Sequence, residues 1–143
     1  MSPNLDKALC EKYPLLFKDR HGDMKETLMC WGFECGDGWY PLIHTLCASL
    51  MWDGYNYKNN FIRENPPTVV QVKEKFGTLR FYVHGGNEKD QAEIAFAEYL
   101  SGTVCEDCGM MKDVETKDTT GWVRSLCPSC RASREAPVQV ALP

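Results

Sequence analysis

The sequence predicts an α+β fold in which helices pack on a small β-hairpin or sheet, followed by a C-terminal unit built around four cysteines. Apolar residues recur at helical spacing between Asp37 and Gly54. Residues 68–84 alternate apolar and polar side chains around a Phe-Gly pair, which is typical of a hairpin. Two CxxC pairs follow. We expect the domain organisation to be an α+β domain over 1–103, a zinc ribbon over 104–135 and a tail over 136–143.

Composition favours an ordinary globular chain. Of 143 residues, 43% are hydrophobic and 25% charged, and the net charge is −4. The first residues contain no apolar run of the length that a signal peptide or membrane span needs, so we expect a cytoplasmic protein without membrane contact. In that reducing compartment the eight cysteines are expected to be metal ligands and buried thiols.

Two helices are predicted in the N-terminal half. Asn4 can cap a short first helix that ends at Tyr13, and residues 17–30 have the polar character of a loop. Asp37 is the expected N-cap of the strongest helix, which tolerates Pro41 in its first turn. The buried stripe of that helix is expected to contain Trp39, Leu42, Ile43, Leu46, Cys47, Leu50 and Met51.

The hairpin at 68–84 supplies the best binding surface. Strict alternation places Val70, Val72, Leu79, Phe81 and Val83 on its inner face. The segment 58–89 is the only basic part of the chain, with six basic and three acidic side chains. The outer face offers Lys73, Lys75, Arg80 and Tyr82, which suit a nucleotide, a short single strand or an acidic protein patch. A solvated strand face explains the same residues without any ligand.

A third helix is expected after Asn87, which is a good N-cap ahead of acidic residues. Its apolar stripe is expected to pack on the core and consists of Ala92, Ala95, Phe96, Tyr99 and Leu100.

The four C-terminal cysteines have the spacing of a structural zinc site. Cys105 and Cys108 form one CxxC pair, Cys127 and Cys130 form the other, and 18 residues separate the pairs. We expect one structural zinc ion, held by a hairpin and a short final helix in a ribbon or treble-clef arrangement. A closed Cys₄ sphere has no open position for water, so it stabilises the fold without performing chemistry. Cations expected to balance the site are Lys112, Arg124, Arg131 and Arg134.

The stretch WGFECGDGWY, residues 31–40, holds further candidates. Glu34 and Asp37 could bind a ligand or act as paired carboxylates, and Trp39 could contribute a ring. A plain structural role, as helix cap or core, explains the same residues.

A second metal site from Cys30, Cys35, His44 and Cys47 is an open alternative, although cysteine on an apolar stripe also behaves as a small hydrophobe.

The blocks FECGDGWY, VKEKFGTLRFYV and the terminal CxxC pairs resemble a family of short uncharacterised proteins carried by tailed phages and prophages. The resemblance covers roughly residues 30–130. It implies a viral origin and the bacterial host cytoplasm as the place of action.

Three functions follow as expectations. The first is a non-enzymatic zinc-binding protein that binds a host bacterial protein or a small nucleotide and acts in anti-defence or host takeover. The second is a nucleic-acid-binding accessory protein, which the pI near 5.4 disfavours. The third is an enzyme that uses Glu34, Asp37 or His44. The sequence leaves the oligomeric state open.

Overall fold

The computed structural model describes residues 1–52 and 63–136, and it confirms the α+β architecture. The end of the second predicted helix at Gly54 and nearly all of the predicted tail lie outside the described residues. The helices are α1 (Pro3–Lys12), α2 (Tyr40–Leu50), α3 (Glu88–Ser101) and α4 (Pro128–Glu135), with 3₁₀ turns η1 (Met29–Trp31) and η2 (Asp37–Trp39). The strands are β1 (Phe33–Glu34), β2 (Thr68–Lys75), β3 (Thr78–His84), β4 (Glu115–Thr119) and β5 (Trp122–Leu126).

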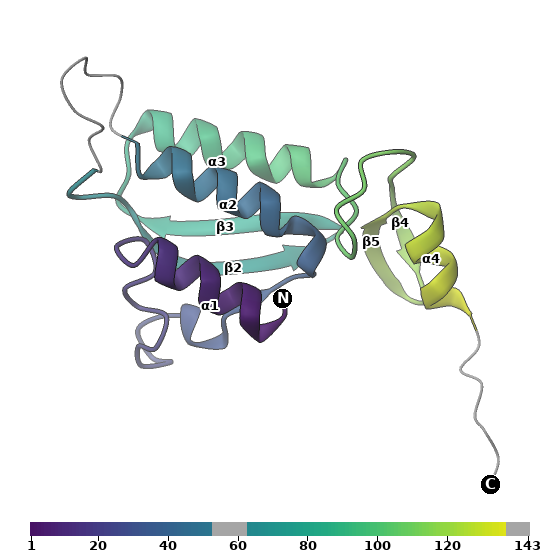
Figure 1. The fold of residues 1–143 in the computed structure, drawn as a ribbon, viewed down its shortest axis with the longest axis horizontal. Helices are drawn as coiled ribbons and strands as arrows, with labels where there is room; N and C mark the ends of the chain where they lie inside the picture. Colours follow the sequence, from purple (N-terminus) through teal and green to yellow (C-terminus); the bar gives the residue numbers. More distant parts are fainter. Residues whose placement is uncertain (53–62, 137–143) are drawn as a thin grey trace, which may run out of the picture.

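A three-stranded sheet in the order β1-β2-β3 forms the centre of the larger body. β1 runs parallel to β2, and β3 returns antiparallel to it. One core joins the buried side chains of the sheet to those of α1, α2 and α3. The β4–β5 hairpin and α4 form a smaller body at the end of the sheet (Figure 1). Among the described residues, no helix has the length and apolarity that crossing a bilayer requires.

The hairpin register differs from strict alternation because β2 contains an irregularity between Val69 and Gln71. Val69 is therefore buried and Val70 is half-buried, which corrects the predicted inner position of Val70. Val72, Leu79 and Phe81 are buried as predicted.

α3 begins at the predicted N-cap, but the side of the helix that is buried is not the predicted one. Asn87 and Asp90 form a capping box. The predicted apolar stripe is wrong, because Ile94 and Ala97 are buried whereas Phe96 and Tyr99 are exposed. Polar side chains fix this orientation from the buried side of the helix.

Two of those polar contacts cover the free edge of β3. The hydroxyl of Ser101 accepts the N–H of Leu79 at 2.8 Å, and Glu98 accepts the N–H of Phe81 at 2.9 Å. Leaving these backbone donors unpaired would destabilise the fold, so the polar side of α3 turns toward the sheet.

The predicted N-caps of α1 and α2 are also wrong. α1 starts at Pro3 with Ser2 as N-cap, so Asn4 lies inside the helix. Asp37 does not cap α2 but opens η2, and its carboxylate accepts the N–H of Ser2 at 2.6 Å. The loop-like segment after α1 nevertheless contributes the buried side chains Phe17 and Met29.

Candidate metal centre

The four predicted cysteines converge. One sulfur from each of Cys105, Cys108, Cys127 and Cys130 lies within 4.8 Å of all the others. The sulfurs of Cys108 and Cys127 are 3.7 Å apart, close to the roughly 3.8 Å edge of a tetrahedron with metal–sulfur bonds of about 2.3 Å. The donor set and its spacing therefore fit a tetrahedral metal ion.

Each cysteine pair is shaped by its local backbone. After the first pair, Gly109 has a φ of +78°, which lets the chain turn so that its N–H reaches the carbonyl of Cys105 at 2.9 Å. The second pair lies at the start of α4, where the backbone N–H of Cys130 lowers the pKa of Cys127 to about 7. Backbone N–H groups directed at the sulfur favour the thiolate that a metal requires.

Three of the four predicted cations form hydrogen bonds to oxygen atoms of the unit. Arg124 contacts Glu106 at 3.3 Å and Arg134 contacts Asp107 at 2.6 Å. Arg131 donates to the carbonyl of Glu115 at 2.6 Å and to the hydroxyl of Thr119. The three arginines therefore tie the unit together: two of them pair with the carboxylates inside the first CxxC, and Arg131 bonds backbone carbonyls of both strands of the β4–β5 hairpin.

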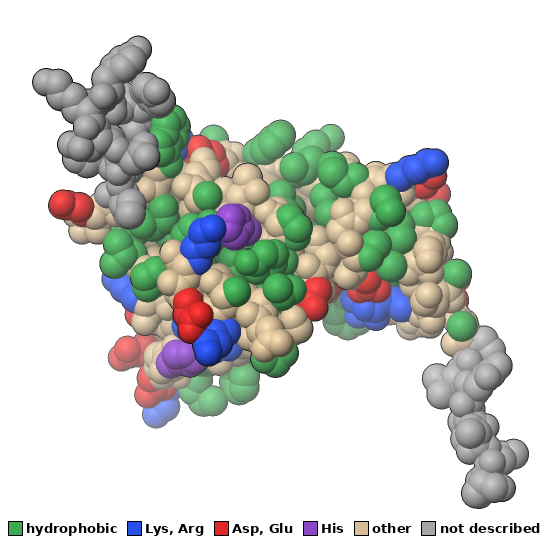
Figure 2. Space-filling model, viewed as in Figure 1, with side chains coloured by type: hydrophobic (Ala, Val, Ile, Leu, Met, Phe, Trp, Pro, Cys, Tyr) green, Lys and Arg blue, Asp and Glu red, His purple; other side chains and the backbone are tan. Residues whose placement is uncertain are grey.

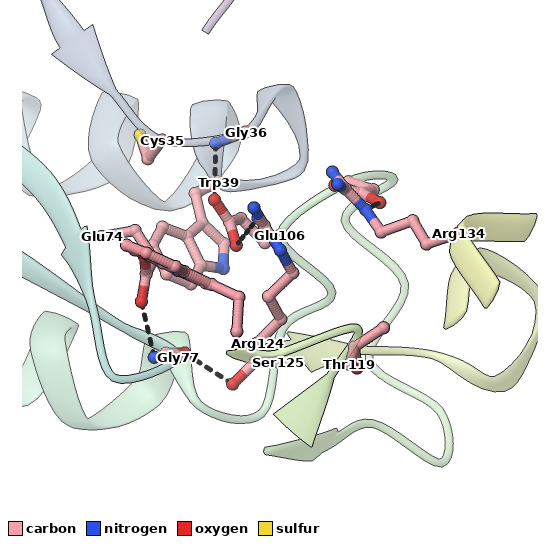
Figure 3. Close-up of polar contacts among 12 residues, drawn as sticks. Cys35, Gly36, Trp39, Glu74, Gly77, Glu106, Thr119, Arg124, Ser125 and Arg134 are labelled. Carbon is pink, nitrogen blue, oxygen red and sulfur yellow. Dashed lines mark hydrogen bonds and ion pairs between the residues drawn. The ribbon is translucent and has the colours of Figure 1, made fainter. Parts of the chain in front are cut away.

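Glu106 links the metal unit to the larger body. Its side chain is buried, and its two oxygens accept the N–H of Gly36 at 3.0 Å and contact Arg124 at 3.3 Å (Figure 3). Its backbone carbonyl accepts the N–H of Gly38 at 2.8 Å. Burial raises the pKa of Glu106, and the opposing charge of Arg124 limits the rise.

The two glycines of FECGDGWY allow the metal unit to approach the larger body closely. A Cβ on Gly36 would clash with the carbonyl oxygen of Glu106, and a Cβ on Gly38 with that of Cys105. The same Cβ on Gly38 would lie 2.5 Å from the backbone nitrogen of Gly109. The backbone of residues 36–38 thus packs directly against the backbone of residues 105–109, an approach that only glycine permits.

Trp39 completes the same junction. Its side chain is fully buried, and its Nε1 donates to the carbonyl of Val104 at 2.9 Å, immediately before the first ligand Cys105. The prediction that Trp39 binds a ligand is therefore wrong, because the ring is an anchor between the two bodies.

The block EKFGTLR makes a second junction. Glu74 accepts the N–H of Gly77 at 2.6 Å and the indole N–H of Trp122 at 2.7 Å. The carbonyl of Gly77 accepts the hydroxyl of Ser125 at 2.6 Å (Figure 3). Gly77 itself has a φ of +79°, as the turn requires. The three distinctive sequence blocks thus meet at one place, where the metal unit docks.

The carboxylate and histidine candidates do not come together. Glu34 is exposed on β1 and pairs in register with Lys73. Asp37 contacts Ser2, and His44 lies against Tyr13, with 3.3 Å between its Nε2 and the tyrosine oxygen. Within residues 1–52 and 63–136 no metal-binding group of three contains any of them.

The alternative second metal site is likewise not assembled. Cys30 donates to the carbonyl of Thr27, while Cys35 and Cys47 are buried in the apolar core. Burial raises the pKa of Cys35 to about 12. Over the described part of the chain, the C-terminal cysteines are the one group of this kind.

The predicted basic face exists and continues into a groove. Lys73 lies opposite Arg80 in the hairpin, and its Nζ is 5.8 Å from the ring centre of Tyr82. Lys75 and Lys73 then border a groove of about 510 Å³ between the tips of the two hairpins. Its other lining residues are Glu74, Phe76, Gly121, Trp122 and Val123, and we call it the tip groove.

Sequence reasoning missed the two aromatic rings of the tip groove. Phe76 is 71% exposed and Trp122 is 57% exposed. Phe76 lies in the β2–β3 turn and Trp122 is the first residue of β5, and nothing in the spacing indicates that two hairpin tips 46 positions apart lie side by side. The hydrogen bond from Trp122 to Glu74 makes this placement possible.

No protein-family model, curated protein or solved structure matches this chain. The inferences below therefore rest on the geometry of the chain itself.

Proposed function

We propose that the protein is a zinc-stapled binding protein that modulates a host factor in the bacterial cytoplasm, as a phage-encoded agent of anti-defence or host takeover. The observation that carries the binding role is the tip groove with its adjoining basic face. Exposed aromatic rings and cations meet there, and the hydrogen bond to Glu74 fixes Trp122 of the docked metal unit beside them. Aromatic and arginine side chains of this kind supply most of the binding energy of protein interfaces.

Zinc is the metal we propose for the four cysteines. A tetrahedral set of four thiolates is the usual ligand sphere of structural zinc, and it leaves no open position for a reacting water. The ion would be held by Cys105, Cys108, Cys127 and Cys130, and would stabilise the unit that carries Trp122.

The proposed partner is an acidic patch on a host protein. Lys73, Lys75 and Arg80 provide positive charge, and Phe76 and Trp122 provide apolar anchors. Strand addition at β3 is disfavoured as the binding mode, because side chains of α3 cover that edge. Recognition would therefore proceed through side chains.

A nucleotide or short single strand is the second candidate. The tip groove falls in the range of about 300–1,000 Å³ typical of small-ligand sites. Two rings beside two lysines suit a stacked base with its phosphate. The acidic net charge of −4 favours a single nucleotide over a long strand.

Affinity capture from a bacterial host lysate, followed by calorimetry with the purified partner, tests the primary proposal. Trp122→Ala should weaken binding at least about tenfold, in the usual range for an aromatic anchor. Trp31→Ala is the matched control, because Trp31 is equally exposed and lies on η1 away from the groove. Binding that survives Trp122→Ala and a Lys73→Glu, Arg80→Glu double change would refute the assignment of the surface.

Native mass spectrometry separates the two candidate partners. A nucleotide that co-purifies with the wild type and is absent from Trp122→Ala supports the small-ligand alternative. A protein partner that binds equally well after nucleotide is removed supports the primary proposal.

A further inference from the structure

The outer side of α3 carries an apolar stripe. Ala92, Ala95, Phe96 and Tyr99 follow the spacing i, i+3, i+4 and i+7, so they share one face of the helix, and all four are exposed. The rings of Phe96 and Tyr99 are 65% and 79% exposed. Figure 2 shows hydrophobic side chains along the upper edge of the molecule, where Figure 1 places α3. A grouped apolar surface of this kind marks an interaction site.

Small and large side chains along the stripe are arranged so that the stripe complements itself. When two copies of α3 lie antiparallel with a two-fold axis between residues 95 and 96, Ala95 of one copy faces Phe96 of the other. Ala92 faces Tyr99 in the same register. Each ring then packs over a methyl group, and two-fold symmetry repeats both pairs on the other side of the axis.

The charges along α3 permit this register. Glu88, at one end of the stripe, would face Thr103 of the second copy rather than another acidic group. Lys89 and Glu93 already pair with each other at 3.1 Å along the helix. Glu93 and Glu98 occupy matching positions in this register, but Glu98 is turned toward the sheet, where it accepts the N–H of Phe81, so the two carboxylates do not meet across the axis.

We propose that α3 forms a two-fold homodimer in which Ala92, Ala95, Phe96 and Tyr99 pack antiparallel against the same residues of a second copy. One face of a 14-residue helix buries less than the roughly 800 Å² per partner of a standard interface, so the dimer is weak and reversible. α3 ends next to the metal unit, and an antiparallel pair places the two metal units at opposite ends. The dimer would present two tip grooves, and a partner with repeated sites would bind it more tightly than it binds one copy.

Sedimentation equilibrium of the metal-loaded full chain, from about 10 µM to about 1 mM, tests this interface. We expect a monomer–dimer equilibrium that weakens at least about tenfold in a Phe96→Ser, Tyr99→Ser variant. Trp31→Ser with Phe76→Ser is the control, because it removes two aromatic rings of similar exposure from other surfaces. The control should associate like the wild type. Circular dichroism checks that every variant keeps its helix content.

A charge pair tests the register. Ala95→Lys and Phe96→Glu should each weaken association at least about tenfold, because each inserts a charge next to an apolar group. Combined, the introduced lysine faces the introduced glutamate across the axis, so association should recover at least about fivefold relative to either single variant. A wild type that stays monomeric to about 1 mM, or a combined variant no tighter than the single ones, would overturn the proposal.

Discussion

Gly38 shows how a single residue without a side chain can decide whether two bodies fit. The carbonyl of Cys105 and the amide of Gly109 occupy the space where its Cβ would be. These are backbone atoms beside the metal ligands, and they cannot move aside as a flexible side chain would. The requirement for glycine comes from a contact 67 positions away in the sequence, so it could not be derived from the local pattern GDG.

Replacing Gly38 with alanine should therefore separate the metal unit from the body. We expect a loss of about 2 kcal/mol or more in the free energy of unfolding, together with faster release of the metal to a chelator. Gly102→Ala is the control, because the added Cβ would meet only ordinary contacts at 3.5 Å or more and the φ of −66° suits alanine. Thermal unfolding and chelator competition measure both effects. Equal behaviour of the two variants would contradict the close approach.

Glu106 acts at the same contact through its charge. Glu106→Gln keeps an oxygen for the N–H of Gly36 and loses the ion pair with Arg124, so we expect about 1–3 kcal/mol of destabilisation. Glu115→Gln is the control, since Glu115 is exposed and pairs only with exposed Lys117. Its melting temperature should match that of the wild type. Urea unfolding of both variants gives the comparison.

At the scale of elements, the existence of α2, α3 and both hairpins follows from the sequence, and their orientation follows only partly. Asn87 fixes where α3 begins because a cap is a local interaction. The buried side of α3 depends on which groups lie opposite, and here the edge of β3 selects Glu98 and Ser101 over Phe96 and Tyr99. Helical periodicity identifies an apolar stripe and does not say whether a core or a partner covers it.

Asp90 holds the first turn of α3 in place and gives the fold an acid-sensitive element. Its carboxylate is buried and contacts Arg63 at 2.7 Å. Burial would raise the pKa of Asp90, but the hydrogen bonds and charge of Arg63 outweigh it, and the pKa lies below its usual value. The stabilisation is therefore complete above the unfolded-state pKa of about 3.9 and is lost as the pH falls through the lower folded-state pKa.

Asp90→Asn should destabilise the protein by about 3 kcal/mol at pH 7, because it leaves the arginine without this charged partner. The difference between wild type and variant should shrink as the pH falls below about 4. Urea unfolding of both proteins between pH 7 and pH 3 measures this difference in the free energy of unfolding. A difference that stays constant over this range would contradict a charge-based role. Glu26→Gln, at an exposed position outside the helices and strands, is the control and should show no such pH dependence.

At the scale of the whole molecule, the metal ligands were the part of the site that the sequence could predict, because the CxxC spacing is itself a local property of the chain. The sequence favours ligand binding for the stretch that contains Trp39, yet Trp39 and the glycines of FECGDGWY form the surface on which the metal unit docks. Polar and aromatic residues that hold two bodies together have the same composition as residues that hold a ligand. Only the tertiary arrangement distinguishes the two roles.

Removal of the metal should therefore also raise hydrogen–deuterium exchange in part of the larger body. Without the ion, nothing holds the four sulfurs together and the loop between Cys105 and Gly109 loosens, so Glu106 and Val104 no longer hold the 36–39 segment. In hydrogen–deuterium exchange, chelation should raise exchange in residues 105–130 and, with it, in residues 33–39. The centre of β2 around Val72 should stay protected, since its core contacts lie within the larger body.

Cys108→Ser should reproduce this exchange pattern because it removes one ligand, whereas Cys30→Ser, outside the cluster, should not. Trp122 is held by Glu74 only while the β4–β5 hairpin is docked, so partner binding at the tip groove should fall together with the protection of residues 33–39. If residues 33–39 stayed fully protected after the metal is removed, the two bodies would be independent, and the metal could not control the groove.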